Sequence, residues 1–191
     1  MAQPDRLDVT QPFTAARARA AGISRAALRG PRYQTLFRGV YLSSAIRVHG
    51  EVLARAALLL FPPGAFISHH TAAQLHGFAS DLGGPVEVTV ARDGDRRQVA
   101  GTICRVRGSG DVWRRPGDVP RSMPAQTFAE LAGECGLVDH VALGDHLVRR
   151  FQVTPAQFAA AVAALRGRPR GLAEEAKSRN PRSRRHPLSA L

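Results

Sequence analysis

The sequence has little of what defines several common protein classes. Its two cysteines, Cys104 and Cys135, stand far apart and in no zinc-binding spacing, which argues against a disulfide framework and against a structural metal site. The apolar run at residues 56–61 is far too short to cross a bilayer. The first ten residues contain two aspartates and lack the apolar core of a signal peptide. We therefore expect a cytoplasmic protein without membrane contact, metal or cofactor.

Lysine is also nearly absent, since Lys177 is the only one, and almost all of the positive charge comes from arginine. An arginine stays charged and can direct two donors at a phosphate or a guanine edge, which suits nucleic-acid binding. A high-GC coding sequence would also produce an arginine-rich, lysine-poor chain. The position of the charge is therefore more informative than its total.

The excess positive charge is confined to the two ends of the chain. Basic and acidic residues number 8 and 2 in residues 1–50, 4 and 5 in residues 51–100, 7 and 6 in residues 101–150, and 8 and 2 in residues 151–191. This distribution is expected if the terminal segments contact a polyanion and the central body does not.

The first basic segment has the pattern of a helix-turn-helix. Residues 14–21 are good helix formers between Thr14, a typical N-cap, and Gly22, while Ser24 can cap a second short helix over residues 25–29. The stretch that follows, RYQTLFRGVYLS, predicts a hairpin with strands at 34–37 and 40–43. Together they predict a winged helix-turn-helix over residues 1–48. The apolar residues expected to join its hairpin to its helices are Leu28, Leu36, Val40 and Leu42.

The remaining sequence predicts a mixed α/β body over residues 49–170, with a helical C-terminal part, followed by a basic, partly disordered tail over residues 171–191. The fold class is therefore α+β. The expected elements of the body are helices at 51–61 and 69–76, the second capped by Ser68, antiparallel neighbouring strands at 85–91 and 102–106, and helices at 124–134, 138–150 and 154–166.

A winged helix-turn-helix places its second helix in the major groove, with the N-terminal residues at the base edges, and its wing along the backbone or minor groove. This geometry nominates seven DNA-binding residues: Ser24, Arg25 and Arg29 on the recognition helix, Arg32 and Arg38 near the wing, and Arg17 and Arg19 on the first helix. The alternative is a protein–protein module whose arginines only solvate its surface.

Catalysis has no visible site in the sequence, and we expect that the protein is not an enzyme. His69, His70 and His76 suggest a metal site, but seven residues of helix separate His69 from His76 by about 10 Å, too far to share one ion without a third ligand between them. Ser109 and Ser122 lack the context of a nucleophile elbow. The acidic residues of the middle show no nuclease arrangement and are expected to be solvated loop carboxylates: Asp93, Asp95, Asp111, Asp118, Glu130 and Glu134.

The segment PFTAARARAAGISRAALRGPRYQTLFRGVYL resembles the N-terminal winged-helix region of the AbiEi antitoxin family, the DNA-binding halves of type IV toxin–antitoxin systems. The similarity continues through AALLLFPPGAFISHHTAAQLHGF, PVEVTVARDGDRRQ and SMPAQTFAELA, as in actinobacterial proteins of this architecture, and covers most of residues 11–170. The resemblance implies autoregulatory binding to double-stranded DNA. Many relatives continue into a domain similar to very-short-patch-repair endonucleases. This sequence ends at Leu191, where that domain would begin, so we do not expect nuclease activity, and one interpretation of the basic tail is a remnant of that domain.

Three functions remain open at this point. The first is a transcriptional regulator or antitoxin-like protein that binds an operator near its own gene, as a homodimer or at paired sites. The second is the non-catalytic N-terminal part of an endonuclease-like protein whose chemistry was lost or comes from another chain. The third is an interaction module that neutralises a cognate toxin protein, with DNA contact incidental.

Overall fold

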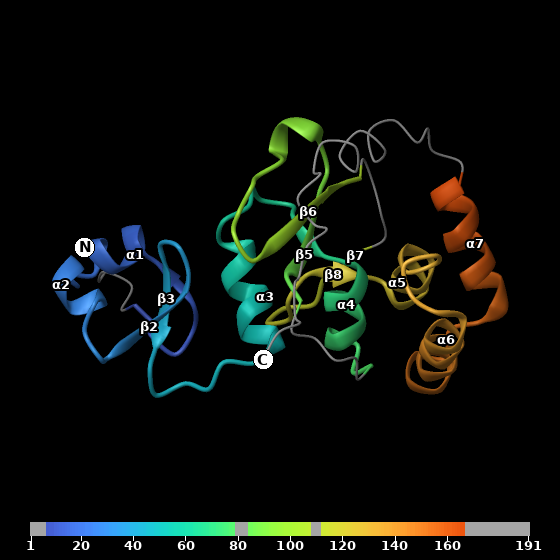
Figure 1. Cartoon of the computed structure of the whole chain (residues 1–191), viewed down its shortest axis with the longest axis horizontal. Helices are drawn as coiled ribbons and strands as arrows, with labels where there is room; N and C mark the ends of the chain where they lie inside the picture. Colours follow the sequence, from blue (N-terminus) through green and yellow to red (C-terminus); the bar gives the residue numbers. More distant parts are fainter. Residues whose placement is uncertain (1–6, 79–83, 108–111, 167–191) are drawn as a thin grey trace, which may run out of the picture.

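The structure is a computed structural model that describes residues 7–78, 84–107 and 112–166. Three parts follow one another along the longest axis: a small N-terminal unit, a central sheet with its helices, and a group of C-terminal helices (Figure 1). The described residues form one three-stranded and one five-stranded sheet together with seven α-helices. The predicted α+β class is confirmed, whereas the predicted basic tail, like Ser109 and Asp111, lies outside the described residues.

The N-terminal unit contains two short helices and a small antiparallel sheet of order β1-β3-β2. Both predicted caps are present, because the Thr14 Oγ1 accepts a hydrogen bond from the Arg17 amide at 3.3 Å and the Ser24 Oγ accepts one from the Ala27 amide at 3.1 Å. The predicted hairpin is also confirmed. The elements are β1 Phe13–Thr14, α1 Ala15–Ala20, α2 Arg25–Leu28, β2 Tyr33–Phe37 and β3 Val40–Ser43.

The hairpin of β2 and β3 has two apolar faces. One face joins the core of the N-terminal unit, where the Phe13 ring lies 5.6 Å from the ring of Tyr33. A β-bulge between Thr35 and Phe37 shifts the register, so that Phe37 pairs with Val40. Because side chains alternate along a regular strand, the extra residue moves Phe37 to the face opposite Tyr33.

That second face of the hairpin belongs to the core of the body. Phe37 and Val40 are buried in one cluster with Ala54 and Ala57, and Leu36 packs against the same cluster. The expectation that Leu36 and Val40 join the hairpin to its own helices is therefore wrong. Leu28 does pack in the N-terminal core, as predicted, and Leu42 is fully buried. The sequence pattern could not separate the two faces, because both are apolar.

The body has a five-stranded sheet of order β6-β5-β4-β8-β7, against which α3 and α4 pack (Figure 1). The prediction of antiparallel strands at 85–91 and 102–106 is wrong, because β5 and β6 pair in parallel. Parallel neighbours need a crossover connection, which residues 91–101 provide. The elements are α3 Gly50–Leu58, β4 Phe66–Ile67, α4 His69–Leu75, β5 Val86–Val90, the 3-10 turn η1 Asp93–Asp95, β6 Thr102–Val106, β7 Val112–Trp113 and β8 Arg121–Ser122.

The three predicted C-terminal helices are present as α5 Pro124–Glu130, α6 Leu137–Phe151 and α7 Pro155–Arg166. Thr154 caps α7, since its Oγ1 accepts a hydrogen bond from the Gln157 amide at 3.3 Å. Leu143 and Leu147 of α6 are buried at the centre of this helical group. Among the described residues, no helix combines the length and the apolar character that crossing a membrane requires.

Candidate nucleic-acid interface

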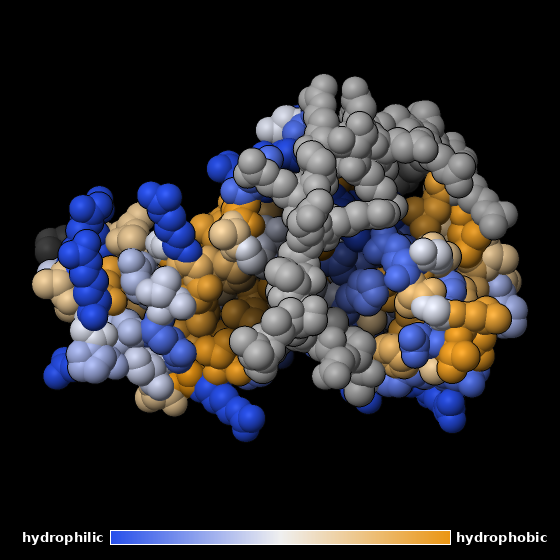
Figure 2. Space-filling model, viewed as in Figure 1, coloured by the Kyte–Doolittle hydropathy of each residue, from blue (hydrophilic) through white to orange (hydrophobic). Residues whose placement is uncertain are grey.

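All seven side chains nominated for DNA contact are exposed on the N-terminal unit. They come from every part of it: Arg17 and Arg19 from α1, Ser24, Arg25 and Arg29 from α2 and its ends, Arg32 from the segment before β2, and Arg38 from the hairpin turn. Strongly hydrophilic side chains project from the N-terminal unit, at the left of the space-filling view (Figure 2).

Nearly all of the charged side chains of this unit are positive. Residues 7–48 contain seven arginines, the six nominated ones and Arg47, against the single acid Asp8. Hydrogen bonds from the Thr10 side chain and amide lower the pKa of Asp8 and hold its carboxylate in place. Within the described part of the chain, none of the seven arginines forms an ion pair. Their guanidinium groups are therefore available to an external anion.

The short helices decide which of these arginines act together. Arg25 and Arg29 are four positions apart, so they lie on one side of α2, which buries Leu28 on another. Arg17 and Arg19 are separated by about 200° around α1 and point to different sides. The structure thus brings Arg25 and Arg29 together as one pair and does not join Arg17 to Arg19.

The body holds a buried ionic cluster that the sequence did not predict. Glu130 was expected to be a solvated loop carboxylate, but it lies on α5 and is only 7% exposed. Its carboxylate accepts hydrogen bonds from the Arg107 Nη1 at 2.8 Å, the Ser122 Oγ at 2.7 Å and the His69 amide at 3.1 Å. Burial raises the pKa of Glu130, while these donors and the Arg107 charge act in the opposite direction.

Glu87, from the fully buried strand β5, makes the second half of this cluster. Its carboxylate accepts hydrogen bonds from the His70 amide at 2.7 Å and from the Arg105 Nη2 at 2.8 Å, and the same Nη2 lies 2.9 Å from the Glu134 Oε2. His70, Glu87 and Glu134 offer ligand atoms within 4.8 Å of one another. Because the Arg105 guanidinium already bridges the two carboxylates, this group is better described as an ion-pair network than as a metal site.

The two buried carboxylates also cap α4, which corrects the prediction that Ser68 would do so. The Ser68 side chain makes no capping bond, and its Oγ instead accepts a hydrogen bond from the Thr89 hydroxyl at 2.8 Å. The free amides at the start of α4 donate to Glu130 and Glu87. An acid within the β-forming run VEVTV was the sequence signal for such a buried charge.

Two histidines of α4 and its end are held neutral inside the body. Burial, together with the nearby positive charge of Arg105, lowers the pKa of His69 to about 2. Burial likewise lowers the pKa of His76 to about 4, although its hydrogen bond to the Ser122 carbonyl oxygen, at 2.8 Å from the Nε2, favours the charged form. The centroid of the His76 ring lies 5.1 Å from that of the Phe151 ring, at the point where α4 ends.

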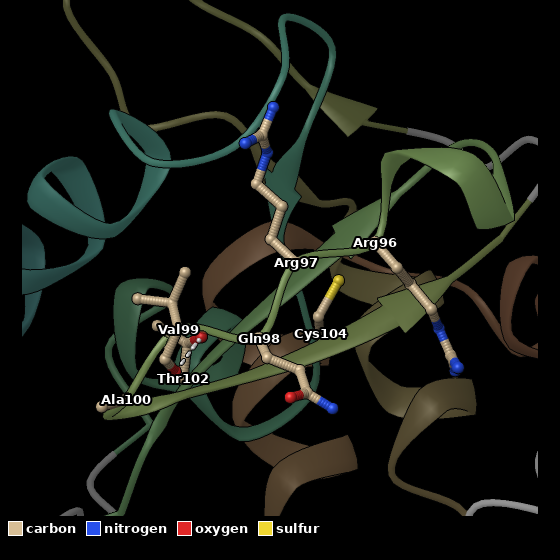
Figure 3. Close-up of a pocket in the computed structure, with 7 residues that line it drawn as sticks. All are labelled: Arg96, Arg97, Gln98, Val99, Ala100, Thr102 and Cys104. Atoms are coloured by element: carbon tan, nitrogen blue, oxygen red, sulfur yellow. Dashed lines mark hydrogen bonds between the residues drawn. The ribbon is translucent and has the colours of Figure 1, made fainter.

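A surface depression with a volume of about 510 Å³ lies beside β6. Residues 96–100, Thr102 and Cys104 line it, and no acid is among them. The side chains of Arg96 and Arg97 extend in different directions, Arg97 towards the top of the view and Arg96 towards the lower right (Figure 3).

Among known proteins, no protein-family model matches this chain, and no curated protein matches it either.

Proposed function

We propose that this protein binds double-stranded DNA through its N-terminal unit, as a winged-helix transcriptional regulator or antitoxin-like protein. One observation carries the proposal: all seven nominated side chains are exposed on a unit with a single acid, and none of its arginines is paired within the described residues. An exposed, unpaired set of arginines is suited to phosphates and guanine edges.

In this proposal α2 is the recognition helix and the hairpin of β2 and β3 is the wing. Arg25 and Arg29 reach base edges from one side of α2, and Ser24 can still donate its hydroxyl hydrogen to a phosphate while its Oγ caps the helix. Arg38, in the turn of the hairpin, contacts the backbone or minor groove. If about five side chains neutralise phosphates, log affinity falls with log salt concentration with a slope of roughly −4 to −5.

The proposal is tested by fluorescence anisotropy with a duplex from the region upstream of the gene and with a scrambled duplex of equal length. Wild-type protein should discriminate between them at physiological salt, and R25A/R29A should lose that discrimination. The variant R149A/R150A is a matched control, because it removes the same charge from the exposed end of α6. Equal binding of both duplexes, or an unchanged R25A/R29A, contradicts the assignment of α2.

The resemblance to AbiEi antitoxins supports a narrower proposal, that the bound site is an operator near the gene itself. A reporter driven by the upstream region should then be repressed by the protein and released by R25A/R29A. A reading frame for a nucleotidyltransferase-like toxin beside the gene would support the antitoxin role. Repression that is absent in this reporter would contradict autoregulation without bearing on DNA binding elsewhere.

The alternative of a protein-interaction module is favoured by the surface of α6. Four large apolar side chains of this helix face solvent, with exposed fractions of 80% for Leu137, 81% for Val138, 55% for Val141 and 44% for Val148. Leu137, Val141 and Val148 fall within an arc of about 40°. Neighbouring exposed apolar residues often mark protein contacts. L137E/V141E should abolish co-purification with the product of the adjacent gene if this face binds that protein.

A further inference from the structure

The connection between β5 and β6 lies against the hairpin of the N-terminal unit. Val99 packs on the cluster that contains Phe37 and Val40, and a Cβ built on Gly101 would be 3.3 Å from the Phe37 ring. The connection runs along the side of the body that faces the N-terminal unit (Figure 1). Because Arg38 directly follows Phe37, residues 96–101 and the hairpin turn are neighbours in a shared, packed core.

The connection contains three arginines, Arg92, Arg96 and Arg97, and two aspartates, Asp93 and Asp95, so its net charge is slightly positive. Arg96 and Arg97 are exposed, and both line the depression beside β6. Arg96 lies 3.5 Å from the exposed carboxylate of Asp93, a solvated contact that costs little to exchange. Within the described residues Arg97 has no ion pair. The other polar lining side chains are neutral: the Gln98 amide can donate hydrogen bonds, while the Thr102 hydroxyl already donates to the Val99 carbonyl oxygen at 2.9 Å.

We propose that Arg96 and Arg97 contact separate phosphates of the same duplex that the N-terminal unit binds, outside the base pairs read by α2. The proposal rests on the proposed function and extends its surface to the body. The two side chains extend in different directions (Figure 3), which suits successive phosphates better than a single free anion. The packed core holds them at a fixed position relative to the hairpin. Such contacts add affinity and orient the protein but carry no sequence information.

The test measures the salt dependence of DNA affinity for R96A/R97A. Each lost phosphate contact should reduce the magnitude of the log–log slope by about 0.9, so the double variant should lose about 1.8. Between about 50 and 200 mM salt, wild-type affinity should therefore fall about 12-fold more than that of the variant. Discrimination between the upstream and scrambled duplexes should remain, and R96K/R97K should restore most of the slope. R149A/R150A, which removes equal charge from α6, should keep the wild-type slope.

A shortened duplex, trimmed to the base pairs protected by the N-terminal unit, separates flanking contacts from site contacts. On it, wild type and R96A/R97A should have the same slope. If wild-type protein binds no DNA, the proposed function itself fails. If wild type binds and R96A/R97A keeps its slope on the long duplex, only this inference is overturned. A slope reduced equally on both duplexes also overturns it, because the contacts would then lie within the site. The thermal unfolding temperatures of R96A/R97A and R96K/R97K should match that of wild type, since the side chains of Arg96 and Arg97 are exposed.

Discussion

Acidification should destabilise this protein through His76. Its ring is almost fully buried against Phe151 and Trp113, and burial lowers its pKa to about 4, from an ordinary value of 6.5. The positive charge of nearby Arg121 acts in the same direction. In the unfolded chain the imidazole is free to take up a proton at its ordinary pKa.

The sign and size of the effect follow from this difference in pKa. Neutral His76 contributes its full stability above pH 6.5, and that contribution is lost as the pH falls towards the folded pKa of about 4. Between pH 7 and pH 5 the unfolded chain takes up most of a proton at this position and the folded chain takes up little. The free energy of unfolding should therefore fall by about 2 kcal/mol from His76 alone.

The assay is urea unfolding of wild type and H76Q at pH 7 and pH 5. A glutamine side chain cannot titrate, and its amide can still donate to the Ser122 carbonyl, so the variant removes the proton uptake and keeps the hydrogen bond. Other titrating groups, including His69, are common to both proteins and cancel in the comparison. Wild type should lose about 2 kcal/mol more than H76Q between the two pH values. Equal losses in the two proteins would refute the reasoning.

Two further predictions concern the core. E130A removes the carboxylate that faces Arg107 and should lower the free energy of unfolding by about 3–5 kcal/mol. E134A, at a partly exposed ion pair, should lower it by about 1 kcal/mol or less. Similar losses for the two variants in urea unfolding would contradict the prediction that burial makes the Glu130 ion pair the costlier one to break. F37A should cost about 3–5 kcal/mol and speed tryptic cleavage in residues 44–49, because its ring joins the two parts of the molecule. T35A, at an exposed position of the same strand, should leave the free energy of unfolding and the rate of tryptic cleavage unchanged.

Local signals predicted much of this fold. Thr14 and Ser24 each cap a helix as expected, because a cap depends on a hydroxyl and an amide only three residues away. The strands of the hairpin were also predicted, since the turn lies between them in the chain. The exposure of the nominated arginines agrees with the sequence, while their role in DNA binding remains a prediction.

The sequence did not predict contacts between residues that lie far apart in the chain. The parallel pairing of β5 with β6 depends on β4, which pairs with the other edge of β5. Because β4 has only two residues, the sequence contains no pattern that predicts it. Glu130 is part of the helix-forming run PAQTFAE, where an acid suits a solvated face as well as a buried one. Its burial is decided by Arg107 and Ser122, which come from distant parts of the chain.

The carboxylates at the start of α4 have a consequence for how the body folds. One comes from β5 in the sheet and the other from α5, beyond the sheet in the chain. A fragment that stopped before α5 would leave a helix end and a buried guanidinium facing the cavity that Glu130 had filled. The sheet and the C-terminal helices should therefore unfold together as one cooperative unit, and amide exchange in α4 should follow global opening of the body.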